Sequence, residues 1–143
     1  MMNIKPKILI AENEKIIAID IKNILHRIGC DVLDIVSSGE EVLRKVKEAK
    51  PDLILMDISL DGALDGIETA EVLSANYDIP VIYLTAFNDR ETLHRARITE
   101  PYGYLVKPFD SREIEIAIDM AFIKRGVSFE DSADPMFPAI FSN

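Results

Sequence analysis

The sequence alternates regularly between short aliphatic runs and longer amphipathic stretches, and this alternation constrains the fold more than any other feature. Repeated strand–helix units produce such a pattern, and runs without intervening polar residues are typical of parallel strands covered on both faces. The predicted strands are Lys7–Ala11, Val32–Val36, Leu53–Met56, Val81–Leu84 and Tyr104–Val106. The sequence therefore predicts an α/β fold with helices on both faces of a parallel sheet.

A helix is predicted after each strand from the spacing of apolar residues and from helix-starting and helix-ending residues. The first contains Ile17 to Ile28 and stops at Gly29, a residue type common just beyond a helix C-terminus. The other predicted helices span residues 39–49, 66–75, 89–99 and 110–125. The helix over 89–99 has few large apolar residues, so we expect it to pack least firmly.

A length of 143 residues suits one globular domain, which we predict over residues 5–125. Residues 126–143 contain two prolines and no basic residue, and we interpret them as a C-terminal tail or linker. The aromatic residues Phe129, Phe137 and Phe141 leave a second interpretation open. In that interpretation the segment docks onto this domain, onto a second copy or onto a further domain.

The charge of the chain limits the classes of partner. Acidic residues outnumber basic ones by 25 to 16, a net charge of -9, and such a field repels phosphate backbones and anionic lipid surfaces. We therefore expect no direct nucleic-acid binding and no membrane binding. The single cysteine, Cys30, excludes an internal disulfide and fits a reducing compartment. With no recognisable signal peptide or membrane-spanning stretch, the predicted location is cytoplasmic.

Four of the predicted strands end beside residues that carry reactive or cation-binding groups. These residues are, in chain order, Glu12, Asn13, Glu14, Asp57, Thr85 and Lys107. In an open parallel sheet, ligands bind at the carboxyl ends of the strands. Each residue alone has a plain structural explanation, such as a helix start or a turn. Together, their oxygen atoms and ammonium group are what a divalent cation and a phosphoryl group require.

Five segments extend this pattern beyond single residues: KILIAENE, PDLILMDISL, DGIE, PVIYLTA and YGYLVKPF. In this order and spacing, over roughly residues 5–125, the sequence resembles the response-regulator receiver domain of two-component signalling. The resemblance implies a doubly wound, flavodoxin-like (βα)5 fold with a five-stranded parallel sheet of strand order 2-1-3-4-5. It also implies Mg²⁺-dependent phosphorylation of an aspartate, with the phosphoryl group supplied by a sensor histidine kinase or a phosphotransfer protein.

The resemblance assigns roles to individual positions. Asp57 matches the phosphoacceptor, Lys107 the phosphate-pairing lysine and Thr85 the switch hydroxyl, while Tyr104 matches the aromatic switch position. The implied metal ligands are Glu12, Asn13, Asp57 and the backbone carbonyl of Ser59. The implied activity is the domain's own phosphorylation and dephosphorylation, which switches a surface that contacts a downstream protein or output domain.

Two features depart from the family pattern. Asn13 stands where the family has a second acidic residue, so we expect weaker metal binding, with Glu12 compensating through a water molecule as one option. The loop SLDGALDG is longer than the common version and carries Asp61 and Asp65. We expect these two residues to be solvated turn residues, with a role in shaping metal access as the alternative.

Two other functions remain open at this point. Asn13 is compatible with a degenerate receiver, a protein-interaction module that is never phosphorylated. A phosphatase of the haloacid dehalogenase type also has an aspartate after an apolar strand, but it needs a second aspartate where this chain has Ser59.

The last predicted helix has more apolar residues than one sheet can cover. Its inward stripe is expected to contain Ile114, Ala117, Ile118 and Ala121, while Ile116, Met120 and Ile123 lie on another face. Such a surplus face is typical of an interface. We expect either the aromatic tail or a second copy of the chain to cover it.

Overall fold

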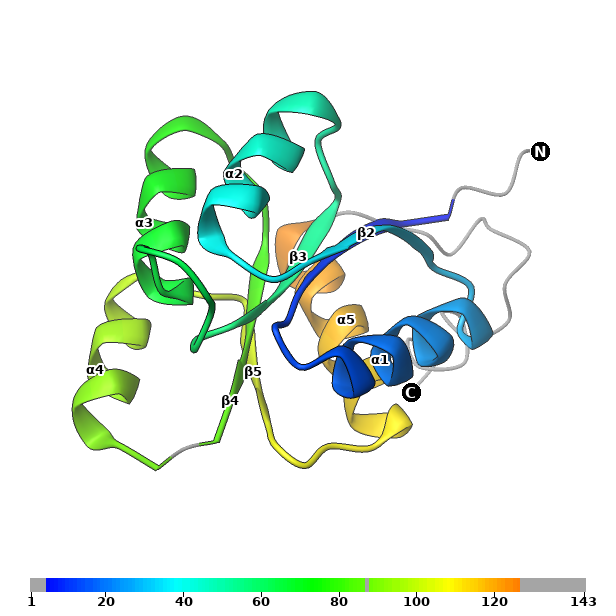
Figure 1. Ribbon diagram of the computed structural model, residues 1–143. Coiled ribbons are helices and arrows are strands. Elements are labelled where there is room, and N and C mark those ends of the chain that lie inside the picture. Colours follow the sequence, from blue (N-terminus) through cyan, green and yellow to red (C-terminus); the bar gives the residue numbers. More distant parts are fainter. Residues whose placement is uncertain (1–4, 87, 127–143) are drawn as a thin grey trace.

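The computed structural model describes residues 5–86 and 88–126 and confirms the predicted α/β fold (Figure 1). All five strands are parallel and lie in the order β2-β1-β3-β4-β5. The strands are β1 (Lys7–Ala11), β2 (Asp31–Val36), β3 (Leu53–Asp57), β4 (Val81–Thr85) and β5 (Gly103–Val106). The helices are α1 (Lys15–Arg27), α2 (Gly39–Glu48), α3 (Gly66–Asn76), α4 (Arg90–Ile98) and α5 (Ser111–Arg125).

The observed elements differ from the predicted ones by one or two residues at their ends. The informative difference is that β3 and β4 each extend one residue further, to Asp57 and Thr85. Both residues still pair in the sheet, Asp57 with Leu84 and Thr85 with Val106. A polar side chain is tolerated at the last position of a strand because the backbone hydrogen bonds do not depend on it. The sheet itself therefore fixes the backbone of both residues.

Helices cover both faces of the sheet, as Figure 1 shows. On one face, α1 and α5 contribute Ile21, Leu25, Ile114 and Ile118 to an apolar core with β-strand residues. On the other face, α2, α3 and α4 contribute a second core whose helical members are Val42, Val46, Ile67, Ala70, Leu73 and Ala96. The strands between these cores are buried on both sides, which explains their lack of alternating polar residues.

Side-chain caps fix where several helices begin, and the most important for the site is that of α3. Asp65 accepts a hydrogen bond from the backbone N–H of Glu68, and Glu68 bonds back to the N–H of Asp65. Gly66 then starts the helix directly against the end of β3, where a Cβ would lie 2.1 Å from the carbonyl oxygen of Asp57. Only glycine fits this approach, so the sequence DGIE brings α3 against the end of the strand that carries Asp57.

The predicted weak packing of α4 is confirmed. Ala96 is the only residue of this helix that is fully buried, and Ile98 is 66% exposed. The helix is instead held by polar contacts, including one between the hydroxyls of Thr99 and Tyr83 at 2.7 Å. Because the Thr99 hydroxyl already donates to the carbonyl of Ala96, the Tyr83 hydroxyl is the donor of this bond.

The two predicted faces of α5 are also confirmed. Ile114, Ile118 and Ala121 are fully buried, whereas Ile116, Met120 and Ile123 are 42%, 57% and 48% exposed. The proposed tail, which begins at Gly126, lies outside the described residues from 127 onward. In the described ranges, every helix is too short or too polar to cross a bilayer.

Candidate functional site

The carboxyl ends of β1, β3, β4 and β5 bring the predicted site residues together. Glu12 directly follows β1, Asp57 and Thr85 are the last residues of β3 and β4, and Lys107 directly follows β5. Backbone hydrogen bonds continue the sheet past the strand ends: Glu12 N–H donates to Val36 and Lys107 N–H donates to Thr85. These residues are therefore held by the sheet, which is the condition for a site of defined geometry.

Lys107 is the centre of the site. Its Nζ donates a hydrogen bond to Asp57 Oδ2 at 2.8 Å and lies 2.9 Å from Glu12 Oε1 and 3.7 Å from Glu14 Oε1. Burial alone would lower the pKa of Lys107, but the hydrogen bond to Asp57 and the close negative charge of Glu12 outweigh it and raise the pKa above its usual value. The lysine is therefore charged and aimed at two carboxylates.

Asp57 lies at the bottom of the site and is 4% exposed. Its Oδ1 accepts a hydrogen bond from the backbone N–H of Ser59 at 2.9 Å, while its Oδ2 accepts from Lys107. The two bonds fix the plane of the carboxylate. They also place Ser59, whose carbonyl is the implied metal ligand, beside the carboxylate in sequence and in space.

Glu12 is buried, with 2% of its surface exposed, and its charge is only partly satisfied. Its Oε2 accepts a hydrogen bond from the N–H of Glu14, but Oε1 is buried without a hydrogen-bond partner among the described residues. The contact of Oε1 with Lys107 is an ion pair that lacks hydrogen-bond alignment. Burial and the nearby Asp57 raise the pKa of Glu12 to about 7. The site thus has a surplus of buried negative charge.

Asn13 and Asp61 are brought together from segments 48 positions apart, since Asn13 Nδ2 donates to Asp61 Oδ1 at 3.1 Å. Asp65, besides capping α3, forms an ion pair with Arg95 of α4 at 3.1 Å. Asp61 is exposed, as expected for a solvated turn residue, and Asp65 is partly exposed, but each has a side-chain partner beyond the turn. Both make long-range contacts, which a turn pattern in the sequence does not reveal.

The two residues assigned to the switch lie on neighbouring strands. Thr85 is 8% exposed at the end of β4, and Tyr104 is half-buried in β5. The Tyr104 ring lies against that of Tyr83, with ring centroids 6.1 Å apart and planes tilted by 35°. Burial raises the pKa of the Tyr104 hydroxyl, with Arg97 of α4 acting in the opposite direction.

A polar pocket of about 760 Å³ opens above these residues. Its walls come from the loops after β1, β3 and β4, from α4 and from Lys107. The lining includes Asn13, Asp57, Ser59, Thr85, Thr92 and Arg95. The pocket therefore brings the Asp57 carboxylate, the Thr85 hydroxyl and the cationic side chains of Arg95 and Lys107 around one space.

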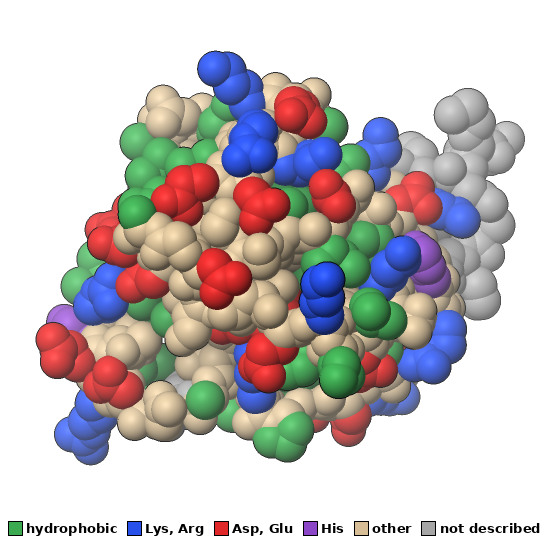
Figure 2. Space-filling model, in the orientation of Figure 1, with side chains coloured by type: hydrophobic (Ala, Val, Ile, Leu, Met, Phe, Trp, Pro, Cys, Tyr) green, Lys and Arg blue, Asp and Glu red, His purple; other side chains and the backbone are tan. Residues whose placement is uncertain are grey.

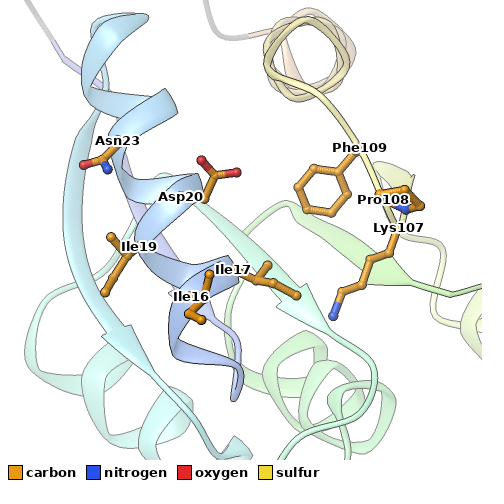
Figure 3. A pocket seen from close by; sticks show the side chains of 8 residues that line it. All are labelled: Ile16, Ile17, Ile19, Asp20, Asn23, Lys107, Pro108 and Phe109. Atoms are coloured by element: carbon orange, nitrogen blue, oxygen red, sulfur yellow. The ribbon is translucent and has the colours of Figure 1, made fainter.

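An apolar pocket of about 580 Å³ adjoins the polar one at Lys107. Figure 3 shows Ile16 and Ile17 of α1 on one side of it, with Phe109 and Pro108 across from them after β5. Ile16 is 85% exposed and Ile19 is 52% exposed. Figure 2 shows hydrophobic side chains at the surface over this part of α1, among charged ones. An apolar surface thus flanks the site.

The donor groups of the site fit a hard divalent cation. Carboxylate, amide and carbonyl oxygens of Asp57, Asn13 and Ser59 are available where these residues line the polar pocket, and such oxygens are the ligands of Mg²⁺. No three His, Cys, Asp or Glu side chains form a ready metal cluster within residues 5–86 and 88–126, so amide and carbonyl oxygens have to complete the set. The Glu12 carboxylate lies next to the pocket, where its Oε1 is paired with Lys107.

Comparison with known proteins agrees with this fold and site. The family model of the response regulator receiver domain matches residues 8–119. The transcriptional regulatory protein PdtaR of Mycobacterium tuberculosis is 34% identical over 115 residues, which cover 80% of this chain and 56% of PdtaR. The phyllosphere-induced regulator PhyR of Methylorubrum extorquens is 30% identical over 116 residues, which cover 80% of this chain and 43% of PhyR.

A solved structure gives the same result. The signal receiver domain of a modulated diguanylate cyclase from Desulfovibrio desulfuricans G20 is 39% identical and has a TM-score of 0.81, covering 86% of this chain and 98% of that one. The doubly wound sheet with acidic residues, threonine and lysine at its strand ends defines a receiver domain. The chain belongs to the response regulator receiver domain family of two-component signalling. It spans about half the length of the relatives PdtaR and PhyR.

Proposed function

We propose that this domain accepts a phosphoryl group on Asp57 in a Mg²⁺-dependent reaction and thereby switches a protein-interaction surface. The observation that carries the proposal is the 2.8 Å hydrogen bond from Lys107 Nζ to Asp57 Oδ2 at the base of the polar pocket. A lysine held against a buried carboxylate, with Thr85 at the next strand end, is an arrangement suited to receiving an anion.

The chemistry follows from the charges of the groups. An ionised carboxylate needs no general base to act as a nucleophile, but the phosphoryl group that it attacks is also negative. As a carboxylate oxygen of Asp57 forms its bond to phosphorus, the bond from phosphorus to the donor's atom breaks and the donor keeps that electron pair. Lys107 offsets the charge that gathers on the phosphoryl oxygens. Bound Mg²⁺ would neutralise part of the same charge.

Thr85 and Tyr104 would transmit the effect of phosphorylation from Asp57 to α4. The hydroxyl of Thr85 lies at the pocket and can donate to a phosphoryl oxygen that has arrived on Asp57, which draws the β4–α4 loop inward. Tyr104 follows on the adjacent strand and lies near α4. Because α4 buries only Ala96, a small free energy suffices to shift it between two arrangements.

The phosphoryl donor in this proposal is a sensor histidine kinase or a phosphotransfer protein that covers the apolar pocket beside Lys107. Ile16 and Ile19 are large side chains left at the surface of α1, close to the entrance of the site. A protein that buries them gains apolar contact energy and brings its phosphorylated residue to Asp57 in the same event.

The exposed stripe Ile116, Met120 and Ile123 on α5 is the proposed output contact, with a second copy, the aromatic tail or a downstream protein as the covering partner. The test is Ile116→Asp, which places a charge in the stripe. Either a change in oligomeric state or a loss of thermal stability supports the contact. Unchanged values of both would exclude the homodimer and the tail contact.

The place of action is proposed to be the cytoplasm, and no role on nucleic acid or lipid is proposed for the domain itself. The single cysteine, Cys30, which is buried and forms no disulfide, supports the first statement, and the net charge of -9 supports the second.

The phosphorylation test is mass spectrometry after incubation with acetyl phosphate and Mg²⁺. The expected result is a gain of one phosphoryl group on Asp57, lost in Asp57→Asn and after chelation of Mg²⁺. Asp31→Asn is the matched control because Asp31 is exposed at the start of β2, at the opposite edge of the sheet.

The second candidate function is an interaction module that is never phosphorylated. The observation in its favour is Asn13, which supplies an uncharged oxygen where the family has an acid. If no phosphoryl group reaches Asp57 under conditions that phosphorylate a known receiver, this second function replaces the first.

A further inference from the structure

The loop after β3 places a carboxylate beside the residue that breaks the family's acidic pair. Asp61 Oδ1 accepts a hydrogen bond from Asn13 Nδ2 at 3.1 Å. A carboxylate accepts but does not donate, so the amide nitrogen of Asn13 must face Asp61. The amide oxygen is therefore the end of the group that remains for a cation in the polar pocket, which Asn13 lines.

Asp61 is held in place by contacts of its own backbone. Its N–H donates to the carbonyl of Ser37 at 3.0 Å, and Asp61 forms a parallel bridge with Ser38. The next residues are fixed by Glu40, which accepts a hydrogen bond from the N–H of Ala63 at 3.1 Å. The backbone of Asp61, in the loop after β3, is thus fixed against the loop between β2 and α2, although the Asp61 side chain is exposed.

The loop can take this position because residue 62 is a glycine. Its φ of 87° lies in the left-handed region, and a Cβ there would lie 2.7 Å from Glu40 Oε1. A glycine after Asp61 therefore lets the loop turn closely against the start of α2. This turn of the loop brings the carboxylate of Asp61 to the side chain of Asn13.

We propose that Asp61 acts as a positioning residue that replaces the missing second acid of the metal site. It orients the Asn13 amide with oxygen toward the pocket and restores one negative charge next to it. The inference rests on the proposed function, because it assumes that the pocket binds a divalent cation. Asp61 would in this way offset part of the loss of Mg²⁺ affinity that is expected from an amide in place of an acid.

The test measures Mg²⁺ binding to the full chain directly, by isothermal titration calorimetry, with no phosphodonor present. Asp61→Asn keeps the size and an acceptor oxygen but removes the charge, and we expect Mg²⁺ affinity to fall about fivefold, as one nearby charge lost in a wet site implies. Asp61→Ala removes both charge and acceptor and is expected to weaken binding at least as much. Raising ionic strength should shrink the effect of Asp61→Asn, since it is electrostatic.

A double substitution that swaps the residues at positions 13 and 61 tests whether Mg²⁺ affinity can be restored. In Asn13→Asp with Asp61→Asn, the charge moves to position 13 and the hydrogen bond is kept with donor and acceptor reversed. We expect this variant to bind Mg²⁺ at least as tightly as the original chain. Asp31→Asn, which changes the net charge equally at the opposite edge of the sheet, should leave the affinity unchanged.

The outcomes separate the inference from the function on which it rests. If the original chain binds Mg²⁺ and the two Asp61 variants bind it equally well, the role of Asp61 is wrong and the proposed function stands. An exchange variant that binds no better than Asp61→Asn has the same meaning. If the original chain and the exchange variant both fail to bind Mg²⁺, the proposed Mg²⁺-dependent function is wrong, and the inference about Asp61 is wrong with it.

Discussion

The helices α1 and α5 on one face of the sheet and α4 on the other are held by different forces. The first two bury large aliphatic and aromatic side chains, among them Ile21, Leu25, Ile118 and Phe122. In α4 only Ala96 is buried, and polar contacts of Arg95 and Thr99, in its C-terminal half, hold the helix. Apolar burial makes a helix costly to displace, whereas a few polar contacts can be exchanged at little cost. The molecule thus combines the firmly packed helices α1 and α5 with one loosely packed helix, α4, that can respond.

The largest expected effect comes from comparing an apolar substitution in α5 with one in α4. Ile118→Ala opens a cavity beneath α5 and should lower the free energy of unfolding by about 3 kcal/mol. Leu93→Ala in α4, where the side chain is only half-buried, should lower it by less than about 1 kcal/mol. Urea unfolding followed by circular dichroism measures both. Equal losses would contradict the difference in packing between α5 and α4.

The second prediction concerns pH and the buried carboxylate of Glu12, which directly follows β1. Because the pKa of Glu12 is raised from 4.5 to about 7, the folded protein holds this proton more tightly than the unfolded chain. Its contribution to stability is complete below the unfolded value and is lost as pH rises toward 7, at a cost of about 2 kcal/mol. Chemical unfolding at pH 5 and pH 8, without divalent cations, measures this loss.

The matched variant for this pH effect is Glu12→Gln, which cannot ionise. Its unfolding free energy should change less between pH 5 and pH 8 than that of the original chain. Parallel profiles of the two proteins would show that Glu12 does not titrate near pH 7.

A smaller effect is expected where α4 is tethered. Thr99→Val removes the acceptor for the buried Tyr83 hydroxyl and should cost about 1 kcal/mol, with faster amide hydrogen exchange confined to α4. Tyr83→Phe removes the donor together with the bond, so it should cost less. Exchange that increases equally in α1 would mean that α4 is not an independent unit.

The smallest effect is expected for the ion pair between Arg95 and Asp65. Their side chains are 42% and 31% exposed, so Arg95→Gln should change the unfolding free energy by less than about 1 kcal/mol. The change should decrease further in high salt. A large loss that does not depend on salt would show that this contact carries more of the attachment of α4 than we infer.

Much of the fold could be predicted because its signals are local. The aliphatic runs gave the strands, and Gly29 and Asp110 lie just beyond and just before helices, as their residue types indicate. The rule that parallel strands present their carboxyl ends together was enough to expect Asp57 and Lys107 in one site, and they lie in hydrogen-bond contact.

The parts that could not be predicted depend on side-chain contacts between distant segments. Nothing in the pattern around Asp61 indicates that it meets Asn13, since a turn sequence reports the backbone and not what the turn packs against. The ion pair of Glu12 with Lys107 and the bond between Tyr83 and Thr99 belong to the same class. Such contacts depend on where a folded loop or helix finally lies, which one-dimensional spacing does not encode.

The position of Lys107 has a consequence for the order in which the site forms. Its ammonium group joins Glu12, which follows β1, and Asp57, which ends β3, although Lys107 itself follows β5, the last strand of the sheet. We therefore expect the two buried acids to gain their counter-charge only once β5 has joined the sheet, so that the site is completed late in folding.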